Sequence, residues 1–206
     1  QGRLTIDPGF RLPDTLTFAG RLFDLRSERL QAKLQTIYDQ ELRSAHVFIP
    51  RSGKYFPLID SIFAEYHIPA DTRYLAIVES RLSPLAESKV GAVGMWQFMK
   101  KTATGFGLTV NDFIDERRHV VKATIAAARF LQSNYDYLAS RGAPDWLLAM
   151  SAYNAGAGNI AKAMQEQGGK DFFDLIMKSD ESHSFVWRAV ATKIIFEHQE
   201  EIFGQP

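Results

Sequence analysis

The 206-residue sequence contains no cysteine, which excludes disulfide bonds and thiolate metal sites. It has no excess charge of either sign, because Lys and Arg together number 24 and so do Asp and Glu. No basic block interleaved with aromatic residues occurs, so we expect no nucleic acid partner. The sequence also lacks an apolar run long enough to span a membrane. Its five histidines are scattered without paired ligand spacing, so we expect no bound metal and no cofactor.

Most of the chain shows helical periodicity of its apolar residues. Residues 1–24 are the first exception, because they carry several Pro and Gly residues and predict an extended arm. Residues 83–94 are the second, and predict a loop or small hairpin. The expected helices begin near Leu30, near Pro57, after Asp71 as an N-cap, near Gln97, at His119, at Pro144–Asp145, after Gly156, and near Ser184, the last running to Phe203. The expected fold is mainly α, with an irregular or β-hairpin segment in its middle, where sites commonly lie.

Glu79 stands out because it lies on an apolar helix face. Leu75 lies four residues before it and Leu82 three residues after it, so its carboxyl group falls on the apolar stripe. Burial disfavours the charged form, so we expect the pKa of Glu79 to be raised and the group to be able to act as a general acid. The alternative is a glutamate at a helix end that bends away to reach solvent.

The loop after Glu79 contains Ser88 and the glycine-rich run from Gly91 to Met99. Its glycines allow the backbone to approach a ligand closely. Trp96 and the methionines offer apolar surface that suits sugar rings, and the Gln97 amide offers both donors and acceptors. The alternative for this segment is a turn that packs on the core. Further on, Tyr153 and Asn154 end a helix before Gly156. The tyrosine hydroxyl could orient a buried carboxyl group, although Asn and Gly also form a common helix stop.

Together these segments resemble, in order and spacing, the signatures of family 1 lytic transglycosylases, which share the goose-type lysozyme-like fold. The likeness rests on Glu79-Ser80, Gly94-Met95-Trp96-Gln97 and Ala152-Tyr153-Asn154-Ala155-Gly156. Ser88 and the run Asp115-Glu116-Arg117-Arg118 also fit the family, while residues 18–20 and 55–59 look like its D-type membrane-bound subgroup. The resemblance covers nearly the whole chain. It implies a lysozyme-like catalytic domain over residues 51–206, preceded by an extended arm and a helix over residues 1–50 that pack on the core.

The family cleaves the β-1,4 bond between N-acetylmuramic acid and N-acetylglucosamine without water and leaves a 1,6-anhydro end. The resemblance therefore implies that Glu79 is the catalytic acid and then the base, while Glu87, the nearest second acid, is expected to be a surface residue. The residues implied to bind or orient the substrate are Ser80, Ser88, Met95, Trp96, Gln97, Met99, Tyr153 and Asn154. Two alternatives stay open: a goose-type lysozyme that places water at C1, and a catalytically silent glycan-binding protein.

The sequence departs from the family pattern at two places. Met95-Trp96 stands where many members have Leu-Met, and Phe185 stands where the family often has Tyr, so the hydroxyl that would make a late polar contact in the groove is missing. The partner that the resemblance implies is the peptidoglycan glycan strand, in the periplasm or cell envelope and associated with the outer membrane. We expect any membrane anchor or LysM-like wall-binding module to lie outside these 206 residues.

Overall fold

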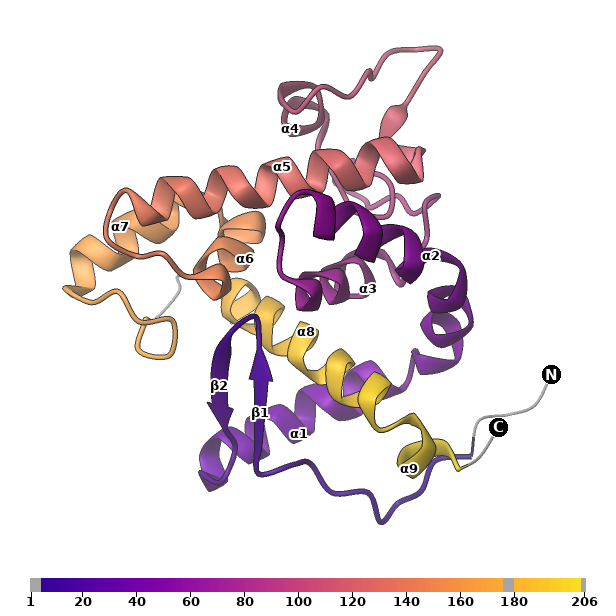
Figure 1. Ribbon diagram of the computed structural model, residues 1–206, viewed down its shortest axis with the longest axis vertical. Helices are drawn as coiled ribbons and strands as arrows, with labels where there is room; N and C mark the ends of the chain where they lie inside the picture. The colour runs from indigo at the N-terminus through magenta and orange to yellow at the C-terminus, as the bar shows by residue number, and fades with distance from the viewer. Residues whose placement is uncertain (1–4, 176–179, 205–206) are drawn as a thin grey trace.

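The computed structural model describes residues 5–175 and 180–204 (Figure 1). Helices dominate these residues, and the only sheet among them has two strands. The mainly α fold expected from the periodicity is confirmed. The elements are β1 (Thr15–Phe18), β2 (Arg21–Asp24), α1 (Glu28–Leu42), α2 (Ala45–Glu65), the 3₁₀ helix η1 (Ala70–Tyr74), α3 (Leu75–Ser80), α4 (Lys100–Gly105), the 3₁₀ helix η2 (Glu116–Arg118), α5 (Val120–Ala139), α6 (Trp146–Ala155), α7 (Ala157–Gln167), α8 (Asp180–Glu197) and α9 (Gln199–Phe203).

The N-terminal arm contains an antiparallel hairpin that the sequence did not indicate. Its turn residues Ala19 and Gly20 both have positive φ angles, 48° and 80°, as two-residue hairpin turns require. The carboxylate of Asp71 accepts a 2.8 Å hydrogen bond from the backbone N–H of Ala19 and lies 3.0 Å from Nζ of Lys193. The expectation that Asp71 is an N-cap is therefore wrong, because its side chain secures the hairpin turn and α8 instead.

Helix α2 begins earlier than its prolines suggested. The expected start near Pro57 is wrong, since the helix begins at Ala45 and contains both Pro50 and Pro57. Each proline removes one backbone hydrogen bond, but the helix continues because side chains such as Phe48 and Ile59 are buried in the core. The helix also runs across residue 50, the boundary expected between the N-terminal arm and the lysozyme-like domain.

Other helix boundaries follow their capping residues. His119 and Asp145 precede α5 and α6 and accept N-terminal backbone hydrogen bonds there, which confirms both expected starts. Helix α4 begins at Lys100 rather than near Gln97, because Gln97 has a φ of 51° that an α-helix does not allow. The last expected helix is interrupted at His198 and forms α8 and α9.

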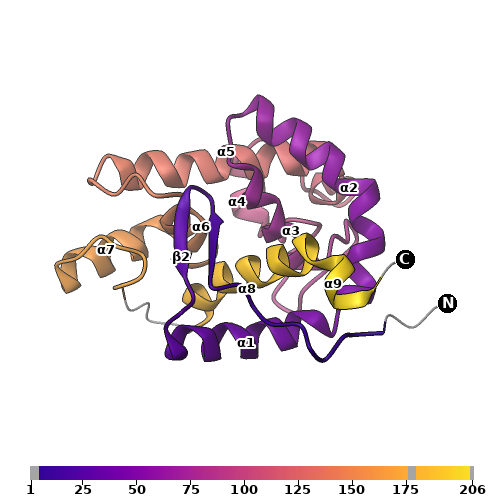
Figure 2. The same ribbon diagram turned by 60° about the horizontal axis from the view of Figure 1, so that its bottom comes forward.

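Helix α3 lies in the interior of the fold, where α8 passes beside it (Figures 1 and 2). Helix α8 also packs on α1 and α6, while α5 packs on α2 and α6. A single cluster of buried hydrophobic residues joins these helices to the hairpin. A side chain on α3 is therefore surrounded by apolar neighbours unless it points out of this cluster.

Candidate active site

Glu79 is half-buried, whereas the other five residues of α3 are buried. Burial raises the pKa of its carboxyl group from 4.5 to about 7, and the charge of Arg188 on α8 opposes this rise. The expected direction of the shift and its cause are confirmed. At neutral pH, Glu79 is therefore protonated in a large fraction of molecules and can donate that proton.

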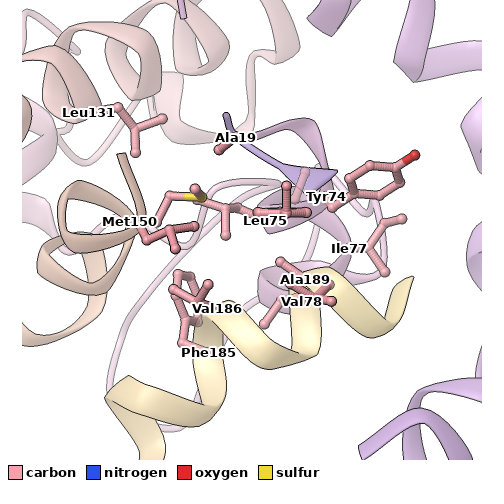
Figure 3. Packing of buried hydrophobic residues seen from close by; sticks show 14 of the residues in the cluster. Ala19, Tyr74, Leu75, Ile77, Val78, Leu131, Met150, Phe185, Val186 and Ala189 are labelled. Carbon is pink, nitrogen blue, oxygen red and sulfur yellow. The ribbon is translucent and has the colours of Figure 1, made fainter. Parts of the chain in front are cut away.

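The apolar surroundings of helix α3, which carries Glu79, come from α3 itself, α6 and α8. Figure 3 shows Leu75 and Val78 of α3 facing Met150 of α6 and the α8 residues Val186 and Ala189. All five side chains are buried. They exclude water from one side of α3, which is why the charged form of a carboxyl group on this helix is disfavoured.

After Glu79 the chain reverses through an unusual turn. Arg81 and Leu82 both have positive φ angles, 56° and 58°, so α3 ends in a left-handed conformation. The Ser80 hydroxyl donates a 2.7 Å hydrogen bond to the backbone oxygen of Met95. Ser80 therefore fastens α3 to the segment that follows it, and its buried side chain is placed to position that segment.

The segment of residues 83–99 is irregular, as expected for residues 83–94, and it packs closely against the 3₁₀ helix η2. Gly94 has a φ of 88°, and a Cβ atom at this position would lie 1.9 Å from the backbone oxygen of Arg117. The buried Arg117 guanidinium donates to the backbone oxygens of Phe98, at 3.0 Å, and Gly91, at 3.2 Å. Arg117 thus holds this segment, a role that the motif resemblance did not indicate.

Gln97 and Tyr153 both bind backbone oxygens of the same segment. The Gln97 amide nitrogen donates to Gly94, at 2.8 Å, and to Ala86, at 3.3 Å. The Tyr153 hydroxyl donates to the backbone oxygen of Trp96 at 2.6 Å. Burial and the nearby charge of Glu79 raise the pKa of Tyr153 well above its usual range, so the hydroxyl keeps its proton beside Glu79. These contacts place both residues where they can fix the wall of the site.

Met95 and Trp96 do not offer the apolar ligand surface that their sequence position suggested. Both side chains are 0% exposed. The Trp96 indole N–H donates to the Thr124 hydroxyl at 3.0 Å, and its ring centroid lies 5.4 Å from that of Phe63. Both side chains therefore belong to the core, which is a correction to the expected sugar platform.

The residues open to a ligand are a smaller set than the motif suggested. Met99 is 46% exposed and Asn154 is also exposed. Ser88 is half-buried, and its hydroxyl oxygen accepts a 3.0 Å hydrogen bond from the backbone of Ala92. Glu87 is an exposed surface residue, as expected, and binds Arg118 at 2.9 Å.

Within residues 5–175 and 180–204, no group of three or more His, Asp or Glu side chains is arranged to hold a metal ion. In the same described part of the chain, every helix is too short or too polar to cross a membrane.

The family of the transglycosylase SLT domain matches residues 61–176, which is more than half of the chain. The chain belongs to this family. The match contains Glu79, Gln97 and Tyr153, and it confirms both the resemblance seen in the sequence and the lysozyme-like fold class. The SLT domain of this chain is therefore the part that carries the candidate site.

Relatives of this SLT domain include proteins whose names state an activity. Membrane-bound lytic murein transglycosylase D of Escherichia coli (strain K12) is 35% identical over 115 residues, which are 56% of this chain and 25% of that protein. Peptidoglycan transglycosylase gp16 of Escherichia phage T7 is 37% identical over 115 residues, which are 55% of this chain and 8% of that protein. The chain thus matches about a quarter of the length of the E. coli relative.

Outside the SLT match, the structure brings three further residues to the site. Phe185 on α8 is buried, and its ring lies parallel to that of Tyr153 with centroids 6.3 Å apart, so this position packs on Tyr153 instead of contacting a ligand. Arg188 on α8 and Glu41 on α1 form an ion pair with a Nε–Oε1 distance of 2.6 Å. The burial of Glu41 could have been predicted from the sequence, because Glu41 continues the apolar stripe of Leu34 and Ile37 on its helix.

Proposed function

We propose that this chain is a peptidoglycan lytic transglycosylase that cleaves the β-1,4 bond between N-acetylmuramic acid and N-acetylglucosamine without water. Glu79 would be its single catalytic acid and base. The observation that supports this most strongly is the burial of Glu79 within an SLT domain, with a pKa raised to about 7. Such a group can give up a proton and take one back at the same pH.

In the first step, protonated Glu79 donates its proton to the glycosidic oxygen. The bond between this oxygen and C1 of the muramoyl residue breaks, and N-acetylglucosamine leaves with a new hydroxyl group. Positive charge develops on the muramoyl ring, as in other glycosidic cleavages. The apolar wall of α3, α6 and α8 favours this step, because it makes the neutral acid the stable form before the reaction.

In the second step, the Glu79 carboxylate removes the proton from the C6 hydroxyl of the same muramoyl residue. The C6 oxygen forms a bond with C1, which closes the 1,6-anhydro ring. Glu79 is protonated again and is ready for the next bond. No water molecule is consumed, and the two products together contain all the atoms of the substrate.

A single carboxyl group can perform this reaction because the nucleophile belongs to the substrate. Most glycosidases need a second carboxylate, as nucleophile or to activate water, about 5–10 Å from the first. Among the described residues, no carboxylate contributes to the pKa shift of Glu79. The exposed Glu87 binds Arg118, and the buried Glu41 binds Arg81 and Arg188. This arrangement favours the internal nucleophile over activated water.

The remaining motif residues would divide into two groups. Gln97 and Tyr153 would keep the segment of residues 83–99 in place and thereby orient Glu79, through the backbone contacts described above. Ser80, Met95 and Trp96 would support that segment from inside, and the accessible residues Ser88, Met99 and Asn154 would contact the glycan.

The cell envelope is the location that fits this substrate. One relative is named as membrane-bound. We extend this to the present chain as a proposal: it would act in the periplasm or envelope, associated with the outer membrane through an anchor outside the 206 residues. A wall-binding module would also lie outside them. Residues 51–206 would form the catalytic domain, and residues 1–50 would pack on it as a supporting arm and helix.

The sugar termini formed by digestion of purified peptidoglycan test this proposal. Mass spectrometry should detect 1,6-anhydromuramoyl ends, lighter by one water than hydrolytic ends, and Glu79→Gln should form none. Reducing ends alone would contradict the proposal and identify a goose-type lysozyme activity. Binding of glycan strands without cleavage by the wild-type chain would identify a silent glycan-binding protein instead.

A further inference from the structure

Glu41 on α1 is a buried carboxylate held by two arginines from different parts of the chain. Its side chain is 2% exposed. One oxygen accepts a 2.5 Å hydrogen bond from Nη1 of Arg81, directly after α3, and the other accepts a 2.6 Å hydrogen bond from Nε of Arg188 on α8. A buried carboxylate with a charged donor on each oxygen is strongly localised. Glu41 therefore fixes the Arg188 guanidinium at its Nε atom.

Among the described residues, Arg188 is the side chain whose positive charge opposes protonation of Glu79. On α6, Tyr153 faces Glu79 and remains neutral. On η1, which also packs against α3, Asp71 binds Lys193, and Arg73 binds Asp60 and Tyr74. These η1 groups are engaged elsewhere, so among the described side chains Arg188 is the cation whose charge acts on Glu79.

We propose that Glu41 is a positioning residue for the reaction, because it holds the Arg188 guanidinium towards α1 and prevents it from forming a direct ion pair with Glu79. This inference rests on the proposed function, since it explains how an acid is kept protonated near a cation. Both Glu41 and Arg188 lie outside residues 61–176, so the match to the SLT domain does not include them.

The physical argument concerns the competition of two carboxylates for one guanidinium. A direct pair between Arg188 and Glu79 would stabilise the charged form of Glu79 and remove the proton that the first step needs. Glu41 wins this competition because its buried carboxylate already binds Nε of Arg188 at 2.6 Å, whereas the burial of Glu79 disfavours its charged form. The Arg188 side chain is 34% exposed, so it has room to move once Glu41 no longer holds it.

The test is the titration of Glu79 in the full chain, followed by carbon-13 NMR of its side-chain carboxyl group and assigned with Glu79→Gln. In Glu41→Gln, Arg188 is released towards Glu79, and the titration midpoint should fall by roughly one pH unit. In Arg188→Gln, the opposing cation is gone and the midpoint should rise. Arg81→Gln is the matched control, because it removes the other ion pair of Glu41 and should leave the midpoint near that of the wild type.

The double variant Glu41→Gln/Arg188→Gln shows whether Glu41 acts through Arg188. If it does, the double variant titrates like Arg188→Gln alone. A midpoint lowered by Glu41→Gln to the same extent with and without Arg188 would overturn the proposal, and so would an unchanged midpoint in Glu41→Gln. If Glu41→Gln does not fold, Glu41→Asp is the variant to titrate. Aspartate keeps the negative charge, but its shorter side chain holds Arg188 less well, so the proposal requires a lowered Glu79 midpoint. An unchanged Glu79 midpoint in Glu41→Asp would overturn the proposal.

These titrations do not depend on turnover. If the wild-type chain fails to cleave peptidoglycan, the proposed function fails while the titrations still decide the role of Glu41. If it cleaves, the alkaline limb of the pH dependence of kcat/KM should move with the Glu79 midpoint in each variant. A merely structural role of Glu41 would lower activity at every pH without moving this limb.

Discussion

The Tyr153 hydroxyl donates a 2.6 Å hydrogen bond to the backbone oxygen of Trp96, which ties the end of α6 to the segment that follows Glu79. The two residues are 57 positions apart in the chain. Glu79 lies close enough to Tyr153 for its charge to affect the pKa of the phenol. This hydrogen bond therefore holds the end of α6 against the segment that follows the candidate acid Glu79.

Replacement of Tyr153 by Phe should lower turnover and leave the fold intact. The change removes one hydroxyl and leaves the buried Trp96 oxygen without this donor, which costs about 1–3 kcal/mol of stability. A displacement of about 1 Å at the reacting groups can reduce the rate on the order of a hundredfold. Release of muropeptides measures the effect.

Tyr135→Phe is the control for this substitution. It removes the same atom from α5, where the Tyr135 ring stacks on Trp146 with centroids 4.3 Å apart, and should keep normal turnover. Equal turnover in Tyr153→Phe and Tyr135→Phe would show that the bond to Trp96 has no part in catalysis.

Alanine substitutions at Gly94 and Gly91 separate the cost of a steric clash from the cost of a strained backbone angle. Both have φ angles near 90°, so alanine at either position is strained, at a cost of about 1–2 kcal/mol. Only at Gly94 would the new Cβ collide with the Arg117 backbone oxygen, whereas nothing lies within 4 Å of a Cβ at Gly91. Gly94→Ala should therefore lose roughly 3 kcal/mol or more and most activity. Denaturant unfolding of both variants measures this, and equal losses would contradict the close contact with Arg117.

The helices could be predicted from the sequence where apolar periodicity and a capping residue coincide. α5 and α6 meet both conditions and begin where His119 and Asp145 indicate. The start of α2 could not be predicted, because the local preference of Pro57 is outweighed by burial of the helix face. The hairpin could not be predicted, because alanine rarely adopts the positive φ that Ala19 has, and the Ala19 N–H is held by Asp71, 52 residues away.

The burial and raised pKa of Glu79 could be predicted from its neighbours on one helix, since desolvation depends on the apolar stripe around it. The orientation of the Trp96 side chain could not be predicted, because an aromatic residue beside a glycine can lie either in the core or on a ligand-binding surface. The pairing of Glu41 with Arg188 joins α1 to α8, and only the tertiary packing of these helices brings the two together.

Glu79→Gln should make the protein more stable than the wild type at pH 8. The folded pKa of Glu79, about 7, exceeds its unfolded value of 4.5, so the native state binds more protons between these values. The contribution of Glu79 to stability is therefore fully present below pH 4.5 and is lost as the pH rises through 7. The loss is on the order of 2 kcal/mol after solvent screening of the half-buried carboxylate.

Thermal melts of both proteins between pH 4 and pH 8 measure this difference. The advantage of the glutamine variant should be present at pH 8 and disappear at the acid end, where wild-type Glu79 is protonated in both states. A variant less stable than the wild type at pH 8 would mean that Glu79 is a stabilising ion-pair partner and that desolvation does not control its pKa.

Digestion of peptidoglycan in water enriched in oxygen-18 tests most directly whether Glu79 drives cleavage without water. The C6 oxygen of the muramoyl residue closes the new ring in the proposed reaction, so the new termini should be 1,6-anhydro ends that carry no heavy oxygen, and Glu79→Gln should produce none. Mass spectrometry of the released muropeptides gives both results in one sample. New muramoyl termini that each contain one oxygen-18 atom would show that water attacks C1, and would contradict an internal nucleophile.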